Sequence, residues 1–283
     1  MRTQIPPGPE KIHPTSSFPP LIKWPGSKRS QARQIVELFP NDYRCYYEPF
    51  VGGGSILFQL GFSKAICGDI CVPLINLWKL IQKAPWDLLD NYRVLWHRLQ
   101  TEGHPVYYEV RERFNHTQDP SDLFFLSRTC VNGLIRFNQR GEFNNSLHHT
   151  RKGIDPDRLE KVLVLWLPRI QNVEFIADDY EYTLSTAASG DFTYLDPPYF
   201  HTKGRYNGRI DYERFFKVLE ALTRKGVRFA LSFDGSRGNT RYPVEIPSNL
   251  YERRIEIESG YSPFRKVMGG SCEIVKETVY LNW

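Results

Sequence analysis

One unit near the start of the chain limits its possible folds more than any other feature. Residues 46–51 (YYEPFV) predict a short strand that runs into three glycines at 52–54, and residues 55–60 then predict a helix. Residues 64–68 (KAICG) predict a second strand, which ends at Asp69. This series forms the first half of a nucleotide-binding α/β sheet. The glycines do not match G-x-G-x-x-G, so the unit gives little support for a dinucleotide ligand.

Strand signals stop after this unit and return only at residue 173. Residues 73–130 carry apolar side chains at helical spacing, and residues 132–151 are polar and rich in Asn, Arg, Gly and His. The sheet then resumes in five predicted strands, at residues 173–176, 192–195, 227–232, 251–257 and 273–281. We therefore predict an α/β fold with a Rossmann-like sheet that a mostly helical insertion interrupts.

This interpretation divides the chain into three parts. Residues 21–72 and 160–283 form the predicted α/β domain, and residues 73–159 form the helical insertion with a polar hairpin. Residues 1–20 hold six of the twenty prolines of the chain. Because proline lacks the amide donor that regular structure needs, we expect a disordered leader there.

Composition narrows the class of protein. The chain has 283 residues, 41% of them apolar, which is enough for a sizeable core. It has no apolar run of the length that spans a membrane and no secretory signal pattern at its N-terminus. Its five cysteines lack zinc-like spacing, so we expect free thiols, no structural metal and a cytoplasmic location. The net charge of +5 permits a polyanionic partner without requiring one.

The sharpest chemical motif follows the predicted strand at 192–195. It reads Asp196, Pro197, Pro198, Tyr199. The two prolines hold the backbone extended and remove two donors, while their carbonyls stay available as acceptors. Ligands of open α/β sheets bind at this end of a strand. The group suits a planar ring with an amino substituent: Asp196 and the Pro197 carbonyl accept the two amino hydrogens, and Tyr199 stacks on the ring. An ordinary turn with a packed tyrosine would share the motif.

Two more segments carry side chains that contact anions or base edges. Residues 23–29 (KWPGSKR) place three cations and a flat tryptophan around a turn, so they could face a carboxylate or phosphate. Residues 128–144 are rich in Arg and Asn, the types that read guanine and adenine in a major groove. Taken singly, a solvated basic turn and a polar hairpin loop explain these segments as well.

Taken together and in this order, the motifs resemble those of the Dam-type family of DNA adenine-N6 methyltransferases, the α-ordered class. The shared pattern comprises KWxGxK at 23–28, EPFxGGG at 48–54, Asp69, NGLxRxNxxGxFN at 132–144 and DPPY at 196–199. It extends over nearly the whole chain after the leader. The resemblance implies a methyltransferase that uses S-adenosylmethionine and methylates N6 of an adenine flipped out of double-stranded DNA, with the helical insertion as its target-recognition domain.

The resemblance also implies roles for single residues. The implied contacts to S-adenosylmethionine are Trp24, Lys28, Glu48, Pro49, Phe50, Gly52, Gly54, Asp69, Asp179 and Asp196. Among them, the 48–54 loop cradles the methionine part and Asp69 accepts the ribose hydroxyls. Asp179 contacts the cofactor's adenine, with its neighbour Asp178 as the alternative. Residues 196–199 hold the target adenine and carry the catalysis.

The implied DNA contacts lie in the first turn and in the insertion: Lys23, Arg128, Asn132, Leu134, Arg136 and Asn138. The basic loop at 203–209 is interpreted either as a holder of the extruded strand or as a mobile loop. We expect double-stranded DNA as the partner, a restriction endonuclease as an indirect one if the enzyme serves a restriction-modification pair, no membrane, and a monomer.

Three departures from the family pattern leave the recognition sequence open. Val131 stands where close relatives carry an aromatic side chain, residues 145–149 replace Val-Pro-x-Gly-x-Tyr, and the first turn reads Pro-Gly-Ser. Two alternative functions are an N4-cytosine methyltransferase, which usually carries Ser in place of Asp196, and an inactive DNA-binding homologue. A 5-methylcytosine enzyme needs a nucleophilic cysteine after proline, and the chain has no Pro-Cys pair.

Overall fold

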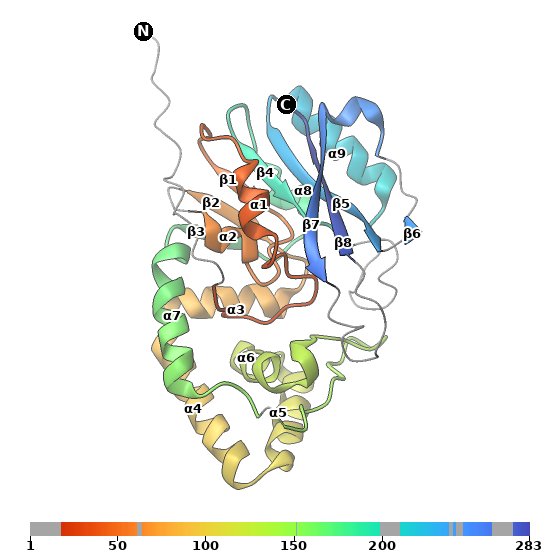
Figure 1. The fold of residues 1–283 in the computed structure, drawn as a ribbon. Coiled ribbons are helices and arrows are strands. Elements are labelled where there is room, and N and C mark those ends of the chain that lie inside the picture. The colour runs from red at the N-terminus through yellow and green to blue at the C-terminus, as the bar shows by residue number, and fades with distance from the viewer. Residues whose placement is uncertain are drawn as a thin grey trace.

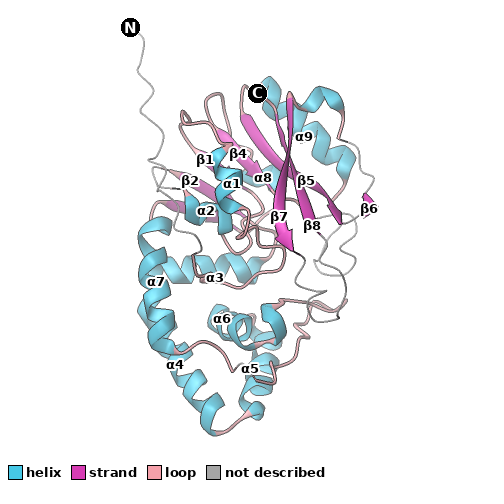
Figure 2. Cartoon of the chain, in the orientation of Figure 1, coloured by secondary structure: helices cyan, strands magenta, loops and turns pink. Residues whose placement is uncertain are grey.

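The computed structural model describes residues 18–60, 64–150, 152–198, 210–237, 240–241, 246–261 and 274–283. A twisted sheet forms one part of the molecule and a group of helices forms the other, with α3 (Val72–Lys83) between them (Figure 1). Figure 2 shows the same division by structure type, because the described strands all lie in the upper part. Along the chain, the helices α3 to α7 lie between the strands β2 and β3.

One sheet contains all the described strands: β1 (Tyr46–Glu48), β2 (Ala65–Gly68), β3 (Val173–Ile176), β4 (Phe192–Leu195), β5 (Arg228–Arg237), β6 (Thr240–Arg241), β7 (Arg253–Tyr261) and β8 (Ile274–Leu281). The order is β3-β2-β1-β4-β5-β8-β7, and β6 pairs with β5. The first five strands are parallel, and β8 lies antiparallel between β5 and β7. The strand order reverses between β1 and β4, where open α/β sheets bind ligands. This confirms the predicted Rossmann-like fold.

Alternating side chains divide the sheet into two buried faces. Tyr46 points into one core and its neighbour Tyr47 into the other. The first face is covered by α1 (Ala32–Glu37), α2 (Ser55–Gln59), α3 and α7 (Pro156–Ile170), and the second by α8 (Tyr180–Thr183) and α9 (Tyr212–Arg224). Because β2 and β4 are buried on both faces along their whole length, they are apolar runs, which is why the sequence located them well.

Helix α3 ties the helical part to the sheet. Its Trp78 stacks on Phe175 of β3 with 5.4 Å between ring centroids, and Trp166 of α7 lies 5.4 Å from Trp78. The Gln82 side chain donates to the Val173 carbonyl at 2.8 Å. The predicted division between residues 72 and 73 places α3 in the insertion, whereas these contacts show that it also packs on the sheet. The division into domains stays a prediction.

The remaining helices form the lower part: α4 (Pro85–Thr101), α5 (His104–Thr117) and α6 (Pro120–Thr129), followed by the short turn η1 (Val131–Gly133). Each of the three helices has proline in its first turn, where the missing N–H has no helical partner anyway. The Asp119 side chain caps α6 by accepting from the N–H groups of Ser121 and Asp122. Every residue from Asp122 to Thr129 is buried, so α6 is the central helix of this part.

The first described residues belong to the core. Phe18 is buried and stacks on Phe58 with 4.2 Å between centroids, and Trp166 donates its indole N–H to the Pro19 carbonyl at 3.0 Å. The leader expected over residues 1–20 therefore includes one buried residue, Phe18, and two prolines whose carbonyls accept hydrogen bonds from Trp166 and Arg128. Residues 1–17 lie outside the described residues.

Membrane-spanning helices, metal-ligand clusters and cysteines were sought in the described part of the chain. None of its helices has the length and apolar character to cross a membrane. Within the same residues no group of three or more His, Cys, Asp or Glu side chains is arranged to hold a metal ion. Cys45, Cys67, Cys71 and Cys130 are free thiols, and Cys272 lies outside the described residues.

Candidate active site

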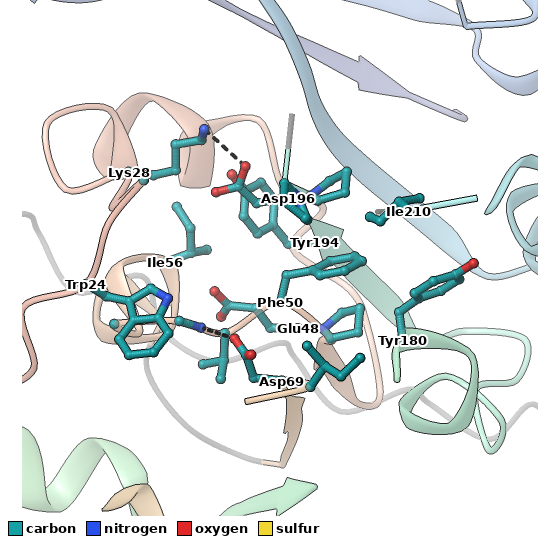
Figure 3. Close-up of a pocket in the computed structure, with 18 of the residues that line it drawn as sticks. Trp24, Lys28, Glu48, Phe50, Ile56, Asp69, Tyr180, Tyr194, Asp196 and Ile210 are labelled. Atoms are coloured by element: carbon teal, nitrogen blue, oxygen red, sulfur yellow. Dashed lines mark hydrogen bonds and ion pairs between the residues drawn. The ribbon is translucent and has the colours of Figure 1, made fainter. Parts of the chain in front are cut away.

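A cavity of about 320 Å³ lies at the carboxyl ends of β1, β2 and β4 (Figure 3). Its size is within the range of small-molecule sites. It brings together nine of the ten predicted cofactor contacts: Trp24, Lys28, Glu48, Pro49, Phe50, Gly52, Asp69, Asp179 and Asp196. The tenth, Gly54, lies behind the cavity with its α-carbon against Trp78 and Trp166. In the view of Figure 3, Lys28 and Asp196 lie at one end, Trp24 and Asp69 at the other, and Glu48 between.

The glycine loop allows the backbone to approach Trp24 closely. Gly52 has φ +47°, and a Cβ there would come within 2.8 Å of the indole Cδ1. Its carbonyl accepts from the Trp78 indole at 3.0 Å, and its N–H donates to Asp69 at 3.2 Å. The loop is therefore held at both polar groups, and only glycine fits beside Trp24 without movement.

Asp69 ends β2 at the floor of the cavity. Its Oδ2 accepts from the Gly52 N–H, and its Oδ1 accepts from the Cys71 N–H at 2.9 Å. Burial raises the pKa of this carboxyl to about 6, and the two backbone donors oppose that shift. Since each oxygen has a second lone pair, the carboxylate can still accept hydroxyl donors from a ligand.

Glu48 is a second buried carboxyl in the cavity. It is 3% exposed, and the Tyr46 hydroxyl donates to it at 2.9 Å. Burial raises the pKa of Glu48 to about 8, although the Tyr46 hydrogen bond opposes this. A nearby cation lowers the pKa of such a group, so a cationic ligand beside Glu48 favours its ionised form.

Asp196 ends β4 and forms an ion pair with a lysine. The Lys28 ammonium lies 3.0 Å from Asp196 Oδ1 and 3.1 Å from Glu277 Oε1 of β8. Burial raises the pKa of Asp196 to about 6, Lys28 lowers it, and Glu277 raises it further. Burial alone would lower the pKa of Lys28, but the two carboxylates hold it above its ordinary value. Sequence reasoning missed Glu277, because the predicted strand at 273–281 also carries Glu273, Lys276 and Thr278 and the acid does not stand out there.

The rest of the 196–199 motif is described only in part. Pro197 and Pro198 line the cavity beside Asp196. Tyr194 also lines it and donates its hydroxyl to Ser232 at 2.8 Å. Tyr199 and the loop at 203–209 lie outside the described residues. The predicted stacking role of Tyr199 therefore stays a prediction.

Of the two adjacent acids, Asp179 lines the cavity. Its Oδ1 accepts the N–H groups of Glu181 and Tyr182 at the start of α8, and its Oδ2 lies 2.9 Å from an Arg214 nitrogen. Arg214 also lines the cavity, and sequence reasoning did not find it. The Asp178 carboxylate accepts the N–H of Asp179 at 2.7 Å.

The polar hairpin lies in the segment after α6, where isolated bridges join Cys130 to Leu147 and Phe137 to Phe143. Asn115 of α5 anchors it, because its side chain both accepts from the Phe143 N–H at 2.8 Å and donates to the Phe143 carbonyl at 3.2 Å. The hairpin is thus fixed to the helical part at its middle.

The predicted DNA contacts differ in what their side chains do. Arg136 is exposed and donates from Nε to Asn144 at 2.9 Å. Asn132 is exposed with φ +56°, Leu134 is half-buried, and the Lys23 side chain packs over Gly133.

Two of the predicted DNA contacts form hydrogen bonds within the protein itself. The Asn138 oxygen accepts from the N–H groups of Arg140 and Glu142, and its amide donates to the Glu142 carboxylate at 2.8 Å, so the side chain shapes the hairpin tip. Arg128 is 5% exposed and donates to the Pro20 carbonyl at 2.7 Å. Burial lowers the pKa of its guanidinium to about 10. In this structure the buried guanidinium of Arg128 is directed to the Pro20 carbonyl, and its role as a DNA contact stays a prediction.

The model of the D12 class N6 adenine-specific DNA methyltransferase family matches residues 24–262. The match spans well over half of the chain, from the first turn to β7. The chain belongs to the D12 class of N6 adenine-specific DNA methyltransferases. This confirms the family that the order of motifs indicated, and with it the prediction of an adenine-specific DNA methyltransferase. Neither the N4-cytosine alternative nor the inactive one is favoured.

Individual relatives agree with this family. The chain is 30% identical over 264 residues to the type II methyltransferase M.MjaIII of Methanocaldococcus jannaschii, covering 82% of this chain and 88% of that protein. It is 30% identical to a DNA adenine methylase of Serratia marcescens, covering 81% and 83%. It is 35% identical to the DNA adenine methylase of Escherichia coli K12, covering 63% and 64%.

Proposed function

We propose that this D12-class enzyme transfers a methyl group from S-adenosylmethionine to N6 of an adenine flipped out of double-stranded DNA, with Asp196 as the acceptor for the adenine amino group. One observation carries the proposal. Asp196 is at the carboxyl end of β4 in the cavity lining, and its Oδ1 lies 3.0 Å from the Lys28 ammonium. A carboxylate keeps further lone pairs when one oxygen is paired, so it supplies an acceptor for an amino group at the cavity wall.

The cavity residues suit S-adenosylmethionine, which when bound supplies a methyl group on a positively charged sulfur. Glu48 supplies a carboxylate for the ammonium of the methionine part, because a nearby cation offsets the cost of ionising it. Asp69 accepts the ribose hydroxyls from a position held by two backbone donors.

The remaining cofactor contacts that we propose come from the first turn, the 48–54 loop and Asp179. Trp24, Pro49, Phe50 and Gly52 form the apolar walls beside the sulfur and the methionine chain. Asp179 contacts the adenine of the cofactor, and its place in the cavity lining supports it over Asp178. Gly54 contributes by allowing tight packing behind the loop.

The proposed chemistry rests on how Asp196 holds the amino nitrogen. Asp196 Oδ2 and the Pro197 carbonyl each accept one amino hydrogen, which moves the nitrogen toward tetrahedral geometry and frees its lone pair from the ring. The bound cofactor would supply its methyl group to this lone pair, with both electrons of the carbon–sulfur bond leaving on sulfur. The positive charge that develops on N6 lies beside the Asp196 carboxylate, and one amino proton leaves to water. Positioning and electrostatics supply the rate enhancement.

The hairpin and the first turn form the proposed DNA-reading surface. Arg136, Asn132 and Leu134 lie on the hairpin, and Lys23 packs beneath it over Gly133. Since the target base cannot be reached inside a duplex, it leaves the stack at a cost of a few kcal/mol. Stacking on Tyr199, worth about 1–3 kcal/mol per base, offsets part of that cost.

The cellular setting is part of the same proposal. We propose that the enzyme acts as a monomer in the cytoplasm. The relatives named as type II methyltransferases support a pairing with a restriction endonuclease.

The test is expression in a bacterial host that lacks DNA methylation, followed by sequencing that distinguishes N6-methyladenine from N4-methylcytosine. We expect methyladenine at one short motif. Asp196→Ala should abolish the mark while cofactor and DNA binding remain. Asp157→Ala, at a side chain that is 84% exposed, is the matched control and should keep full activity. Methylation by the Asp196 variant, or methylcytosine in place of methyladenine, would refute the proposal.

A further inference from the structure

Glu277 is a buried acid on β8, the strand next to the edge strand β7. It lies on β8 between Gly235 of β5 and Ile257 of β7, and its side chain is 7% exposed. Burying a carboxylate this deeply is costly unless a cation compensates it. The compensating group is Lys28, whose ammonium lies 3.1 Å from Glu277 Oε1.

Lys28 joins Glu277 to the reacting end of the site. Lys28 and Asp196 line the cavity, whereas Glu277 does not and stands behind the lysine. The ammonium is 3.0 Å from Asp196 and 3.1 Å from Glu277, so both carboxylates share one cation. We propose that Glu277 is a positioning residue for methyl transfer: it fixes Lys28 and takes up part of its charge, so that Asp196 remains a strong acceptor for the adenine amino group. The proposal rests on the proposed function of Asp196.

The net charge of Lys28, Asp196 and Glu277 explains why Glu277 would affect methyl transfer. Lys28 alone would neutralise Asp196, and a neutralised carboxylate attracts a developing positive charge less strongly. With Glu277 included, one cation faces two anions, and the group carries a net charge of −1 next to the nitrogen that becomes positive. The effect is large because all three side chains are shielded from water, with exposed fractions of 7%, 7% and 19%.

The other titratable groups near Asp196 do not change this balance. The Tyr194 hydroxyl is buried and donates to Ser232, and burial raises its pKa far above the ordinary value, so it stays neutral. In the cofactor complex the proposed partner of Glu48 is the methionine ammonium, and this pair of opposite charges adds no net charge beside Asp196. Lys28, Asp196 and Glu277 therefore set the local charge.

Glu277→Gln tests the proposal because it keeps the shape and a hydrogen bond to Lys28 while removing the charge. We expect the single-turnover methylation rate to fall by about 10- to 100-fold, with cofactor affinity within about threefold. We also expect the acidic limb of the pH–rate profile to move down by about one pH unit, because the loss of a nearby anion makes Asp196 easier to ionise. Glu277→Asp should restore part of the rate. The exposed Glu256→Gln, on neighbouring β7, is the matched control and should change neither quantity.

Repeating the Glu277 substitution in a second variant distinguishes a positioning role of Glu277 from a structural one. In Lys28→Met protein the link to Asp196 is gone, so adding Glu277→Gln should cause no further loss of rate. Equal losses in both backgrounds, or a variant with unchanged rate and pH profile, would overturn the inference. Thermal melting of each variant identifies losses that come from unfolding. Failure of the proposed function would look different, since the unmodified enzyme itself would then leave adenine unmethylated.

Discussion

Gly52→Ala is the sharpest test of the assigned cofactor loop. The new Cβ would lie 2.8 Å from Trp24 Cδ1, and since ordinary contacts begin near 3.4 Å, the indole must retreat by about 0.6 Å. The φ of +47° adds backbone strain of about 1–3 kcal/mol. For a chain of this size that strain lowers the melting temperature by about 2–12 °C. Because Trp24 forms a wall of the cavity, we also expect the affinity for S-adenosylmethionine to fall at least about tenfold, or about 1.4 kcal/mol.

Gly103→Ala supplies the matched control. Gly103 also has a positive φ, +82°, but a Cβ there would meet its nearest neighbouring atom, Pro105 Cδ, only at 3.9 Å. It lies between α4 and α5, away from the cavity, so this variant should lose stability and keep its cofactor affinity. Isothermal titration calorimetry with S-adenosylmethionine, alongside thermal melting, compares the two. Equal affinities in the two variants would show that Trp24 and Gly52 do not form the cofactor wall.

Two further predictions concern pH and DNA recognition. Burial raises the pKa of Asp196 to about 6, and only its ionised form is an acceptor at both oxygens with a negative charge for the developing cation. The single-turnover rate at saturating cofactor should therefore fall as pH drops through about 6; a limb near pH 4 would contradict this. Arg136→Ala should weaken discrimination at one base pair by about 1–3 kcal/mol, measured as relative methylation rates on a library of variant sites. The exposed Arg33→Ala on α1 should leave that site preference unchanged, and an unchanged preference in the Arg136 variant would exclude it as a base contact.

The elements around the cavity were predictable because their signals are local. The strand, glycine loop, helix and second strand near the N-terminus appear as β1, α2 and β2, within two residues of the expected ends at all but one boundary. That boundary is the end of β1, which stops at Glu48 rather than at Val51. A strand buried on both faces must be apolar along its length, and a loop that approaches a side chain closely must use glycine. Both requirements act on neighbouring residues, so the chain displays them directly.

Roles that depend on burial were not predictable from the hairpin segment. The sequence predicts Arg128 as a DNA-binding cation. It lies on α6, the central helix of the lower part, and its side chain is buried there. Asn138 reads as a base contact, yet its side chain closes the hairpin tip. An arginine or asparagine has the same chemistry in both settings, and only the packing of the segment decides between them.

The sequence by itself determined the chemistry of this protein: a carboxylate followed by two prolines after an apolar strand, a glycine loop, and an acid at the next strand end. The tertiary structure decided how that chemistry is supported. Glu277 is distant in sequence from Lys28 and Asp196, and it joins them because β8 enters the sheet antiparallel between β5 and β7. Strand order comes from contacts between remote segments, and one strand's own pattern does not encode its neighbours, so this buried charge could be found only in the folded molecule.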